Sequence, residues 1–240
     1  MKVSVVIPVY NEAPTLAQAL QRVLAAPVDD QLELIAVDDA SSDASPDILA
    51  RLAQAEPRLK VLRHQANQGK GAALRTGFAA ATGDVLLVQD ADLEYDPADY
   101  PRLLAPIREG RADVVIGSRF LADGRPAASS VGHGRRSADF LHRAANRSLT
   151  RLSNLMSGLR LTDMEAGYKL FRREVAQGIR IKSDRFGVEP ELVQKVARGK
   201  WRVCEVPIAY DGRTRAEGKK ITWWDGVKAV WCIVRFRLAD

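Results

Sequence analysis

Acidic residues stand directly after short β-branched runs of this 240-residue chain. Asp38 and Asp39 follow one such run, and Asp90 and Asp92, one alanine apart, follow the run Asp84–Val88. Carboxylates gathered at one point repel one another unless a cation neutralises them, and their oxygens are ligands that Mg²⁺ and Mn²⁺ prefer. The spacing therefore predicts a divalent-cation site that bridges to a diphosphate. The alternative is that these aspartates only form turns, for which aspartate has a high preference.

The segment 67–71, Asn-Gln-Gly-Lys-Gly, is a second candidate for phosphate chemistry. Glycines before a helix N-terminus form a loop that favours an anion, and Lys70 adds a positive charge there. The segment lacks the G-x-x-x-x-G-K-[ST] pattern of P-loop proteins, and no G-x-G-x-x-G follows the first strand-like run. The sequence therefore argues against a P-loop nucleotide hydrolase and against a Rossmann-type dehydrogenase.

The elements that would position these residues alternate between strand-like and helix-like segments. Strands are expected at 3–9, 32–37, 59–63, 84–88, 113–116 and 202–208, and helices at 14–26, 45–55, 70–81, 97–109, 137–157, 189–198 and from 222. Nearly continuous apolar strands that alternate with helices predict an α/β fold, in which helices flank a mostly parallel central sheet. Ligands of such sheets bind beyond the carboxyl ends of the strands, where the aspartates lie.

The overall composition limits the class of protein. Hydrophobic residues make up 46% and charged residues 28%, which are ordinary globular values. The two cysteines, Cys204 and Cys232, have no metal-binding spacing, which suits a reducing cytoplasm. No run approaches about 18 apolar residues, and no signal-peptide pattern precedes the first strand. We therefore expect a cytoplasmic protein, either soluble or peripheral on the cytoplasmic face of the membrane.

Positive charge is concentrated in the middle of the chain. The net charge is +6, and between residues 119 and 151 seven arginines stand against two aspartates. Such a segment favours a phosphate-bearing substrate, an anionic membrane or a nucleic acid, and its alternative is a solvated basic surface. Nucleic-acid binding would call for aromatic residues among the arginines, where only Phe120 and Phe140 occur, so we expect no nucleic-acid partner.

The segment 222–240 predicts an amphipathic helix. Basic residues lie off its apolar face, at Lys228, Arg235 and Arg237. The apolar face comprises Trp223, Trp224, Val227, Val230, Trp231, Val234 and Leu238. Tryptophans beside basic residues are typical of a helix in a membrane interface, and the alternative is a helix packed on the domain or on a second subunit. Residues 121–134, rich in Gly, Ala, Ser and Arg, predict a long connection.

Several motifs occur together and in order along the chain. They are IPVYNE (7–12), VDDASSD (37–43), NQGKGAALRTGF (67–78), QDADLEYDP (89–97), GSRF (117–120), TDMEAGYKLFRREV (162–175), RFGVEPEL (185–192) and GRTRAEGKKITWWDG (212–226). This set, which covers essentially the whole chain, resembles the family-2 inverting glycosyltransferases, and within them the polyprenyl- and dolichyl-phosphate mannose and glucose synthases. The resemblance implies a GT-A catalytic domain over 1–221 with a Rossmann-like nucleotide-binding half, followed by the helix 222–240.

The resemblance also implies a hexose donor of the GDP-mannose or UDP-glucose type, with Mg²⁺ or Mn²⁺ as cofactor. The residues that would bind this donor are Pro8, Tyr10, Glu12, Val37, Asp39, Lys70, Asp90, Ala91, Asp92, Arg119, Arg213 and Lys219. Within this set, Asp90 and Asp92 would hold the metal on the diphosphate, and Arg213 and Lys219 would close over it. A diphosphate leaving group needs positive charge where negative charge develops.

Two kinds of acceptor remain open. A polyprenyl phosphate is already an anion and needs no strong base, and it would bind Arg119 with Arg135 or Arg136, because a guanidinium matches phosphate geometry. A sugar hydroxyl in a polysaccharide or glycolipid requires a carboxylate to take its proton, for which Asp163 is the first choice and Glu165 the second. Asp163 could equally be a helix cap or turn residue. We expect a single displacement that inverts the anomeric carbon.

Other classes of protein fit the sequence less well. A sugar-1-phosphate nucleotidyltransferase would need a Gly-rich loop with Arg and Lys directly after the first strand, where this chain has PVYNE. A basic nucleic-acid-binding module is the non-catalytic alternative. Such a module would not bind a nucleotide in a metal-dependent way, whereas the glycosyltransferase would.

Overall fold

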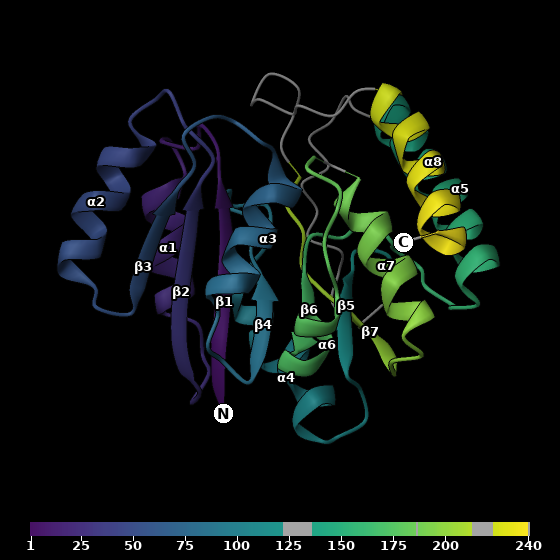
Figure 1. Cartoon of the computed structure of the whole chain (residues 1–240), viewed down its shortest axis with the longest axis horizontal. Helices are drawn as coiled ribbons and strands as arrows, with labels where there is room; N and C mark the ends of the chain where they lie inside the picture. Colours follow the sequence, from purple (N-terminus) through teal and green to yellow (C-terminus); the bar gives the residue numbers. More distant parts are fainter. Residues whose placement is uncertain (122–135, 186, 213–222, 240) are drawn as a thin grey trace.

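The computed structural model describes residues 1–121, 136–185, 187–212 and 223–239, and the side chains of 136–142 and 223–225 lie outside that description. Figure 1 shows a central sheet flanked by helices. The elements are β1 (Lys2–Val9), α1 (Leu16–Leu24), β2 (Gln31–Asp38), α2 (Ser45–Ala55), β3 (Leu59–Arg63), α3 (Lys70–Ala80), β4 (Val85–Val88), η1 (Pro97–Asp99), α4 (Tyr100–Arg108), β5 (Val114–Ser118), α5 (Arg136–Ser157), β6 (Lys169–Arg172), α6 (Arg173–Gly178), α7 (Val188–Arg198), β7 (Val203–Pro207) and α8 (Trp223–Leu238). The predicted alternation of strands and helices is confirmed.

The sheet has seven strands in the order β3-β2-β1-β4-β6-β5-β7. Its neighbouring strands pair in parallel, as predicted, except that β6 runs antiparallel to both β4 and β5. Strand β6 was not predicted, because its run Lys-Leu-Phe-Arg has only two apolar residues between basic ones, and α6 was not predicted, because six residues are too few to display a helical period. Since β6 runs backwards, its first residue, Lys169, pairs with Val88 and Ile116 near the carboxyl ends of β4 and β5.

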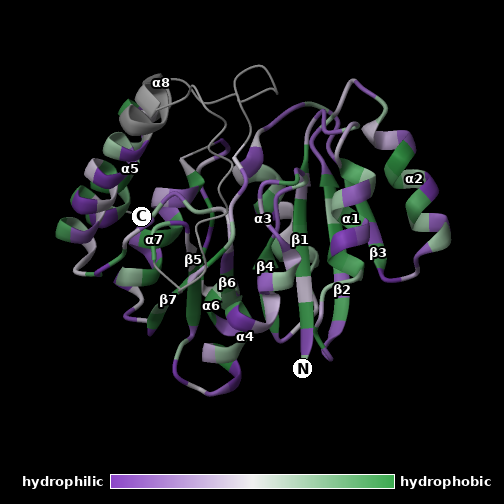
Figure 2. Cartoon of the chain, turned by 180° about the vertical axis from the view of Figure 1, so that it is seen from behind, coloured by the Kyte–Doolittle hydropathy of each residue, from purple (hydrophilic) through white to green (hydrophobic). Residues whose placement is uncertain are grey.

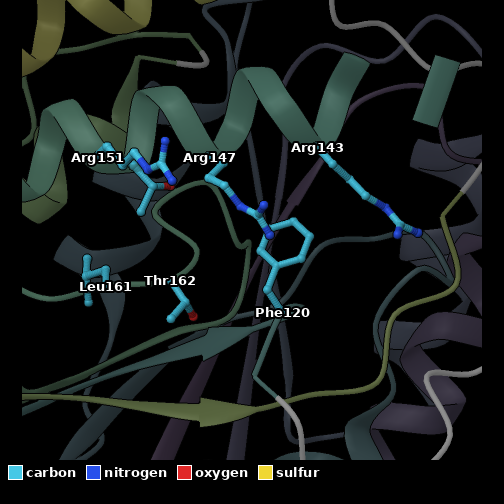
Figure 3. A pocket seen from close by; sticks show the side chains of 7 residues that line it. Phe120, Arg143, Arg147, Arg151, Leu161 and Thr162 are labelled. Carbon is cyan, nitrogen blue, oxygen red and sulfur yellow. The ribbon is translucent and has the colours of Figure 1, made fainter. Parts of the chain in front are cut away.

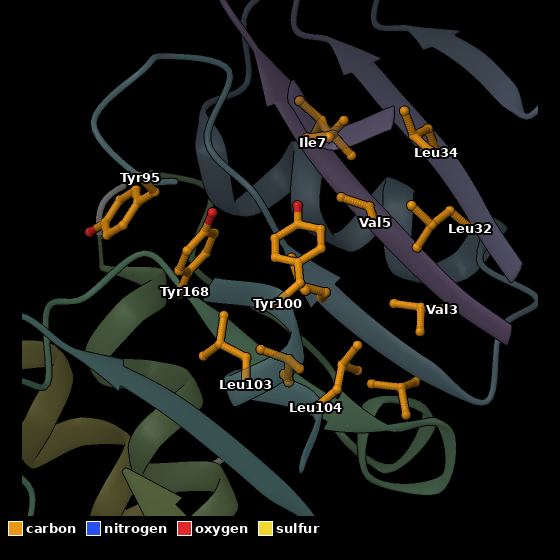
Figure 4. Close-up of a cluster of buried hydrophobic side chains, with 14 of the residues drawn as sticks. Val3, Val5, Ile7, Leu32, Leu34, Tyr95, Tyr100, Leu103, Leu104 and Tyr168 are labelled. Carbon is orange, nitrogen blue, oxygen red and sulfur yellow. The ribbon is translucent and has the colours of Figure 1, made fainter. Parts of the chain in front are cut away.

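Successive residues of the central strands point to opposite faces, and each face has its own core. On one face Val3, Val5 and Ile7 pack with side chains of α1, α2 and α4 (Figure 4). On the other face Val6 packs with Leu74 of α3 and with side chains of α6, α7 and α8. Figure 2 shows the mixed hydrophilic and hydrophobic character of α1, α2 and α5, as expected of helices that cover a sheet.

Helix α8 has apolar residues on both its inner and its outer side. Its inner side buries Ala229, Cys232, Ile233 and Phe236, and the helix packs against α7 and α5 (Figure 1). Its outer side leaves several large apolar residues exposed, namely Val227, Val230, Trp231, Val234 and Leu238. The expected apolar face is therefore the outer one, although the side chains of Trp223 and Trp224 lie outside the description. No helix among the described residues has both the length and the apolar character needed to cross a bilayer.

The N-terminus of α3 packs closely against the backbone of residues 183–184. Ala72 donates its N–H to the carbonyl of Asp184 at 3.1 Å. A Cβ at Gly71 would come within 1.9 Å of the carbonyl oxygen of Ser183, and a Cβ at Gly69, whose φ is 104°, would come within 2.4 Å of that of Asp184. These glycines are therefore needed for a close backbone approach that fixes where α3 begins.

This packing predicts that Gly71→Ala destabilises the fold by about 2 kcal/mol, because an overlap with backbone forces the neighbouring segment to move. Gly178→Ala is the control, since nothing lies within 4 Å of the position its Cβ would take. Urea unfolding measures both variants. Equal stabilities of the two variants would contradict this account of the α3 N-terminus.

Candidate active site

Asp39 is the anion that the glycine-containing loop 67–69 binds. Its carboxylate accepts the N–H groups of Gln68 at 2.9 Å and Gly69 at 2.6 Å, and the side-chain amide of Asn67 at 2.8 Å. Nδ1 of His64 lies 2.7 Å from the same carboxylate. The sequence predicted that this loop would favour an anion, and in the structure a protein carboxylate fills that role. Asp39 is buried and holds the loop that leads into α3.

Lys70 lies in the interior between two acidic residues. Its Nζ is 2.8 Å from Oδ1 of Asp90 and 2.9 Å from Oε1 of Glu189. Burial disfavours the charged form of Lys70, but Asp90 and Glu189 outweigh it and hold the pKa of Lys70 well above its ordinary value. Lys70 is thus the counter-ion of the first aspartate of the Asp90–Asp92 pair. The sequence analysis missed Glu189, whose place in the first turn of a helix is typical of a simple dipole interaction.

Asp90 and Asp92 lie in the loop after β4, at the carboxyl end of that strand. Oδ2 of Asp90 faces Gly167, where a Cβ would come within 2.5 Å of it. Oδ1 of Asp92 accepts the N–H of Glu94 at 3.1 Å. Ala91 between them is buried in the core rather than presented to a ligand.

These two carboxylates fit a metal that arrives with its ligand. Within the described parts of the chain, no group of three or more His, Cys, Asp or Glu residues is placed to hold a metal ion. Mg²⁺ in phosphate-transferring sites is commonly held by one or two carboxylates together with substrate phosphate oxygens and water. The pair therefore matches a cation bound jointly by protein and diphosphate.

Arg119 and Asp163 form a buried, two-pronged ion pair. Nε of Arg119 is 2.7 Å from Oδ2 of Asp163, and Nη2 is 2.8 Å from Oδ1. Asn146 donates to the same carboxylate at 2.9 Å, and the ring of Tyr210 lies 5.0 Å from the guanidinium carbon. Such a fork fixes the plane of the guanidinium, and the rings of Phe120 and Tyr210 enclose it further, so only 18% of the side chain is exposed.

The same contacts argue against Asp163 as the proton acceptor. Burial opposes its charged form, but the hydrogen bonds from Arg119 outweigh burial and lower the pKa of Asp163. A carboxylate with a lowered pKa and occupied oxygens is a poor base at neutral pH. These contacts place Asp163 to position Arg119, and they favour that role over the base first considered from the sequence.

Glu165, the second choice, has the opposite environment. It is half-buried, and its desolvation together with the charge of Glu189 raises its pKa to about 7. Among the described residues its Oε1 has no hydrogen-bond partner, and the same holds for Oε2 of Glu189. Burial also lowers the pKa of the neighbouring Lys169. Glu165 is thus the acidic residue of this edge whose protonation changes near neutral pH.

The remaining donor-site predictions fall on residues of unequal accessibility. Tyr10 is exposed at the end of β1, and Pro8 and Glu12 on either side of it are half-buried. Oε2 of Glu12 accepts a hydrogen bond from Thr15 at 3.2 Å. Val37 is fully buried in the core, so its side chain cannot contact a nucleoside without displacement. Only the first three of these residues are accessible to a ligand.

Four predicted residues cannot be placed. Arg135, Arg213 and Lys219 lie outside the described residues, and Arg136 begins α5 with its side chain outside the description.

A pocket of about 400 Å³ adjoins the Arg119–Asp163 pair (Figure 3). Its lining residues are Phe120, Arg143, Arg147, Thr150, Arg151, Leu161 and Thr162. The sequence analysis counted Arg143, Arg147 and Arg151 in the basic segment but assigned them no role. Their four-residue spacing on a predicted helix was the available signal that they share one face.

Comparison with known proteins places this site in a family. The family model described as "Glycosyl transferase family 2" matches residues 4–180. The chain is 31% identical to the dolichol-phosphate mannosyltransferase of Pyrococcus furiosus over 91% of its own length and 59% of that relative. It is 32% identical to the undecaprenyl-phosphate mannosyltransferase of Micrococcus luteus over 99% of both chains. The chain therefore spans all of one relative and little more than half of the other.

Solved structures agree on the fold. Glucosyl-3-phosphoglycerate synthase of Mycobacterium tuberculosis in complex with Mn²⁺, UDP and glucosyl-3-phosphoglycerate matches the whole of this chain and 81% of its own, with a TM-score of 0.70 and 19% identity. The same enzyme in complex with Mg²⁺ and UDP matches with a TM-score of 0.68. The family resemblance drawn from the motifs is thereby confirmed: the chain belongs to glycosyltransferase family 2 and is a glycosyltransferase with the GT-A fold.

Proposed function

We propose that this glycosyltransferase transfers a hexose from a nucleotide sugar of the GDP-mannose or UDP-glucose type to a polyprenyl phosphate. The observation that carries the proposal is the pocket with both arginine and apolar side chains beside Arg119, whose guanidinium Asp163 holds in place. The names of the two relatives, both polyprenyl-phosphate mannosyltransferases, support this acceptor.

The donor would bind across the carboxyl ends of β1, β2 and β4. Tyr10 and Glu12 would contact the nucleoside, and the fixed loop beside Asp39 would bound its pocket. Asp90 and Asp92 would hold Mg²⁺ or Mn²⁺, which when bound offsets the negative charge of the diphosphate as it leaves. Lys70 would keep the charge of Asp90 in place, because its ammonium already lies 2.8 Å from that carboxylate. The use of Mn²⁺ and Mg²⁺ by the structurally similar synthase supports this choice of cation.

The acceptor would approach from the side of Arg119. A phosphate monoester carries its nucleophilic oxygen already ionised, so no residue has to remove a proton. Arg119 would align that oxygen with the anomeric carbon, since Asp163 fixes the guanidinium plane. Attack from the side opposite the diphosphate inverts the anomeric configuration in one displacement.

A sugar hydroxyl is the second candidate acceptor, and one observation favours it. Glu165, with a pKa of about 7, has the proton affinity of a general base at neutral pH. The phosphate acceptor is the better supported of the two, because the names of both relatives favour it.

We also propose a peripheral position on the cytoplasmic face of the membrane. The exposed apolar side of α8 carries Trp231, and the guanidinium carbon of Arg235 lies 4.6 Å from that ring. A helix with apolar and basic residues of this kind suits the interface of an anionic bilayer. The segment 222–240 would then serve as an interfacial helix appended to a catalytic domain over 1–221.

The proposal predicts that nucleoside diphosphate release from UDP- or GDP-hexoses needs Mn²⁺ or Mg²⁺ and rises at least tenfold when a short polyprenyl phosphate is added. Asp92→Asn should abolish this release, because one of two metal ligands is lost, whereas Asp47→Asn, an exposed position on α2, should leave it unchanged. A coupled assay for the diphosphate measures both. Release that no lipid phosphate accelerates, with any donor, would refute the polyprenyl-phosphate acceptor.

Glu165 predicts a pH dependence of stability. Its pKa in the folded protein, about 7, exceeds the ordinary value of 4.5. Below pH 4.5 the residue is protonated in both the folded and the unfolded chain, so it does not lower the stability there. As pH rises from 4.5 to 7 the unfolded chain loses a proton that the folded chain keeps, and stability falls. Glu165→Gln stays neutral throughout. We expect the wild type to lose up to about 3 kcal/mol more than this variant between pH 5 and pH 8 in urea unfolding. Parallel pH profiles would show that Glu165 is ionised in the folded state.

A further inference from the structure

Helix α5 presents a row of arginines to the pocket beside Arg119. Arg143, Arg147 and Arg151 follow one another at four-residue intervals, so each Cα lies about 6 Å farther along the helix than the last. Figure 3 shows them projecting from α5, with Phe120 and Thr162 across the pocket. A second hollow of about 410 Å³ borders the same three side chains. The row is therefore accessible along its length.

Among the residues whose side chains are described, no carboxylate forms an ion pair with any of the three arginines, although other arginines of the chain, such as Arg58 and Arg202, have such partners. Asp139, one turn before Arg143, lies outside that description. Like charges four residues apart destabilise a helix by about 0.2–0.5 kcal/mol for each pair. The arrangement is therefore unfavourable by itself, and an anion that bound among the three guanidinium groups would relieve it.

The other pocket walls combine polar and apolar groups. Phe120 and Leu161 supply apolar surface, and Thr162 supplies a hydroxyl that lies 2.6 Å from that of Ser118. Leu155, one turn beyond Arg151 on the same row, is 81% exposed and extends the apolar surface outside the pocket. A ligand matched to these walls has an anionic head and an apolar chain.

The pocket lies next to the Arg119–Asp163 pair. Phe120 and Thr162 line the pocket, and their chain neighbours Arg119 and Asp163 form the ion pair. Arg119 donates through Nε and Nη2 to Asp163 and is only 18% exposed. A phosphate monoester carries nearly two negative charges near neutral pH, and Arg119 alone leaves much of that charge unmatched.

We propose that Arg143, Arg147 and Arg151 form a binding site for a phosphate monoester carried on an apolar chain, which receives the acceptor and delivers its phosphate to Arg119. The inference rests on the proposed function and adds to it residues that determine acceptor affinity. The shared chemistry, a phosphate on a lipid, also occurs in bilayer headgroups. Those are phosphodiesters with a single charge, which match three guanidinium groups less well.

The test is calorimetric binding of a ten-carbon prenyl phosphate to the full chain. Arg147→Ala and Arg143→Ala should each weaken its affinity at least tenfold. Arg51→Ala, an exposed arginine on α2 at the opposite end of the molecule, should leave it unchanged (Figure 1). The matching prenyl alcohol should not bind measurably. Mn²⁺-dependent affinity for the nucleoside diphosphate should be the same in all variants, which also shows that they are folded.

Several outcomes would overturn the site. One is unchanged prenyl phosphate affinity in both row variants, and another is a wild type that binds no prenyl phosphate. A third is a row variant that keeps its affinity for the prenyl phosphate but no longer binds phosphatidylglycerol vesicles better than phosphatidylcholine vesicles. That result would assign the arginines to bilayer headgroups. The proposed function fails separately, if the wild type binds the prenyl phosphate through this row yet transfers no sugar to it.

Discussion

The structure depends on how negative charge is balanced at one edge of the sheet. Asp39, Asp90 and Asp163 come from separate segments and meet near the carboxyl ends of the strands, where each has a different partner. Backbone N–H groups and His64 hold Asp39, Lys70 holds Asp90, and Arg119 holds Asp163. Buried carboxylates without such partners would either take up protons or destabilise the fold. Because Lys70 and Arg119 already contact these carboxylates, the charges are paired before any ligand binds.

The antiparallel strand β6 joins the two halves of this arrangement. By running against its neighbours, it brings the preceding residues 163–168 to the same edge as the loop after β4. One end of that segment binds Arg119, and near its other end Gly167 packs against Asp90 and donates its N–H to the hydroxyl of Tyr95 at 2.8 Å. A single short segment thus connects the side where we place the donor diphosphate with the side where we place the acceptor. Gly167 is needed because a Cβ at that position would overlap Oδ2 of Asp90.

The sequence predicted those features that depend on local residue patterns or on several motifs in a fixed order. Apolar periodicity located most strands and helices, and the ordered motifs identified the family before any contact was known. The same methods missed β6, which has four residues and owes its place to strands distant in the chain. They could not show that the loop 67–69 binds Asp39, or that Asp163 pairs with Arg119. Charge and proton affinity depend on partners that only the folded chain brings together.

The central claim is that Asp90 and Asp92, with Lys70 as fixed counter-ion, are the residues that hold a cation on the donor diphosphate. Anomalous X-ray scattering from crystals grown with Mn²⁺ and a nucleoside diphosphate locates the metal most directly. We expect one manganese position within about 2.2 Å of oxygens from this carboxylate pair and from the diphosphate. A manganese ion bound instead at Glu165 and Glu189, or a diphosphate bound without any metal at this edge, would contradict the account.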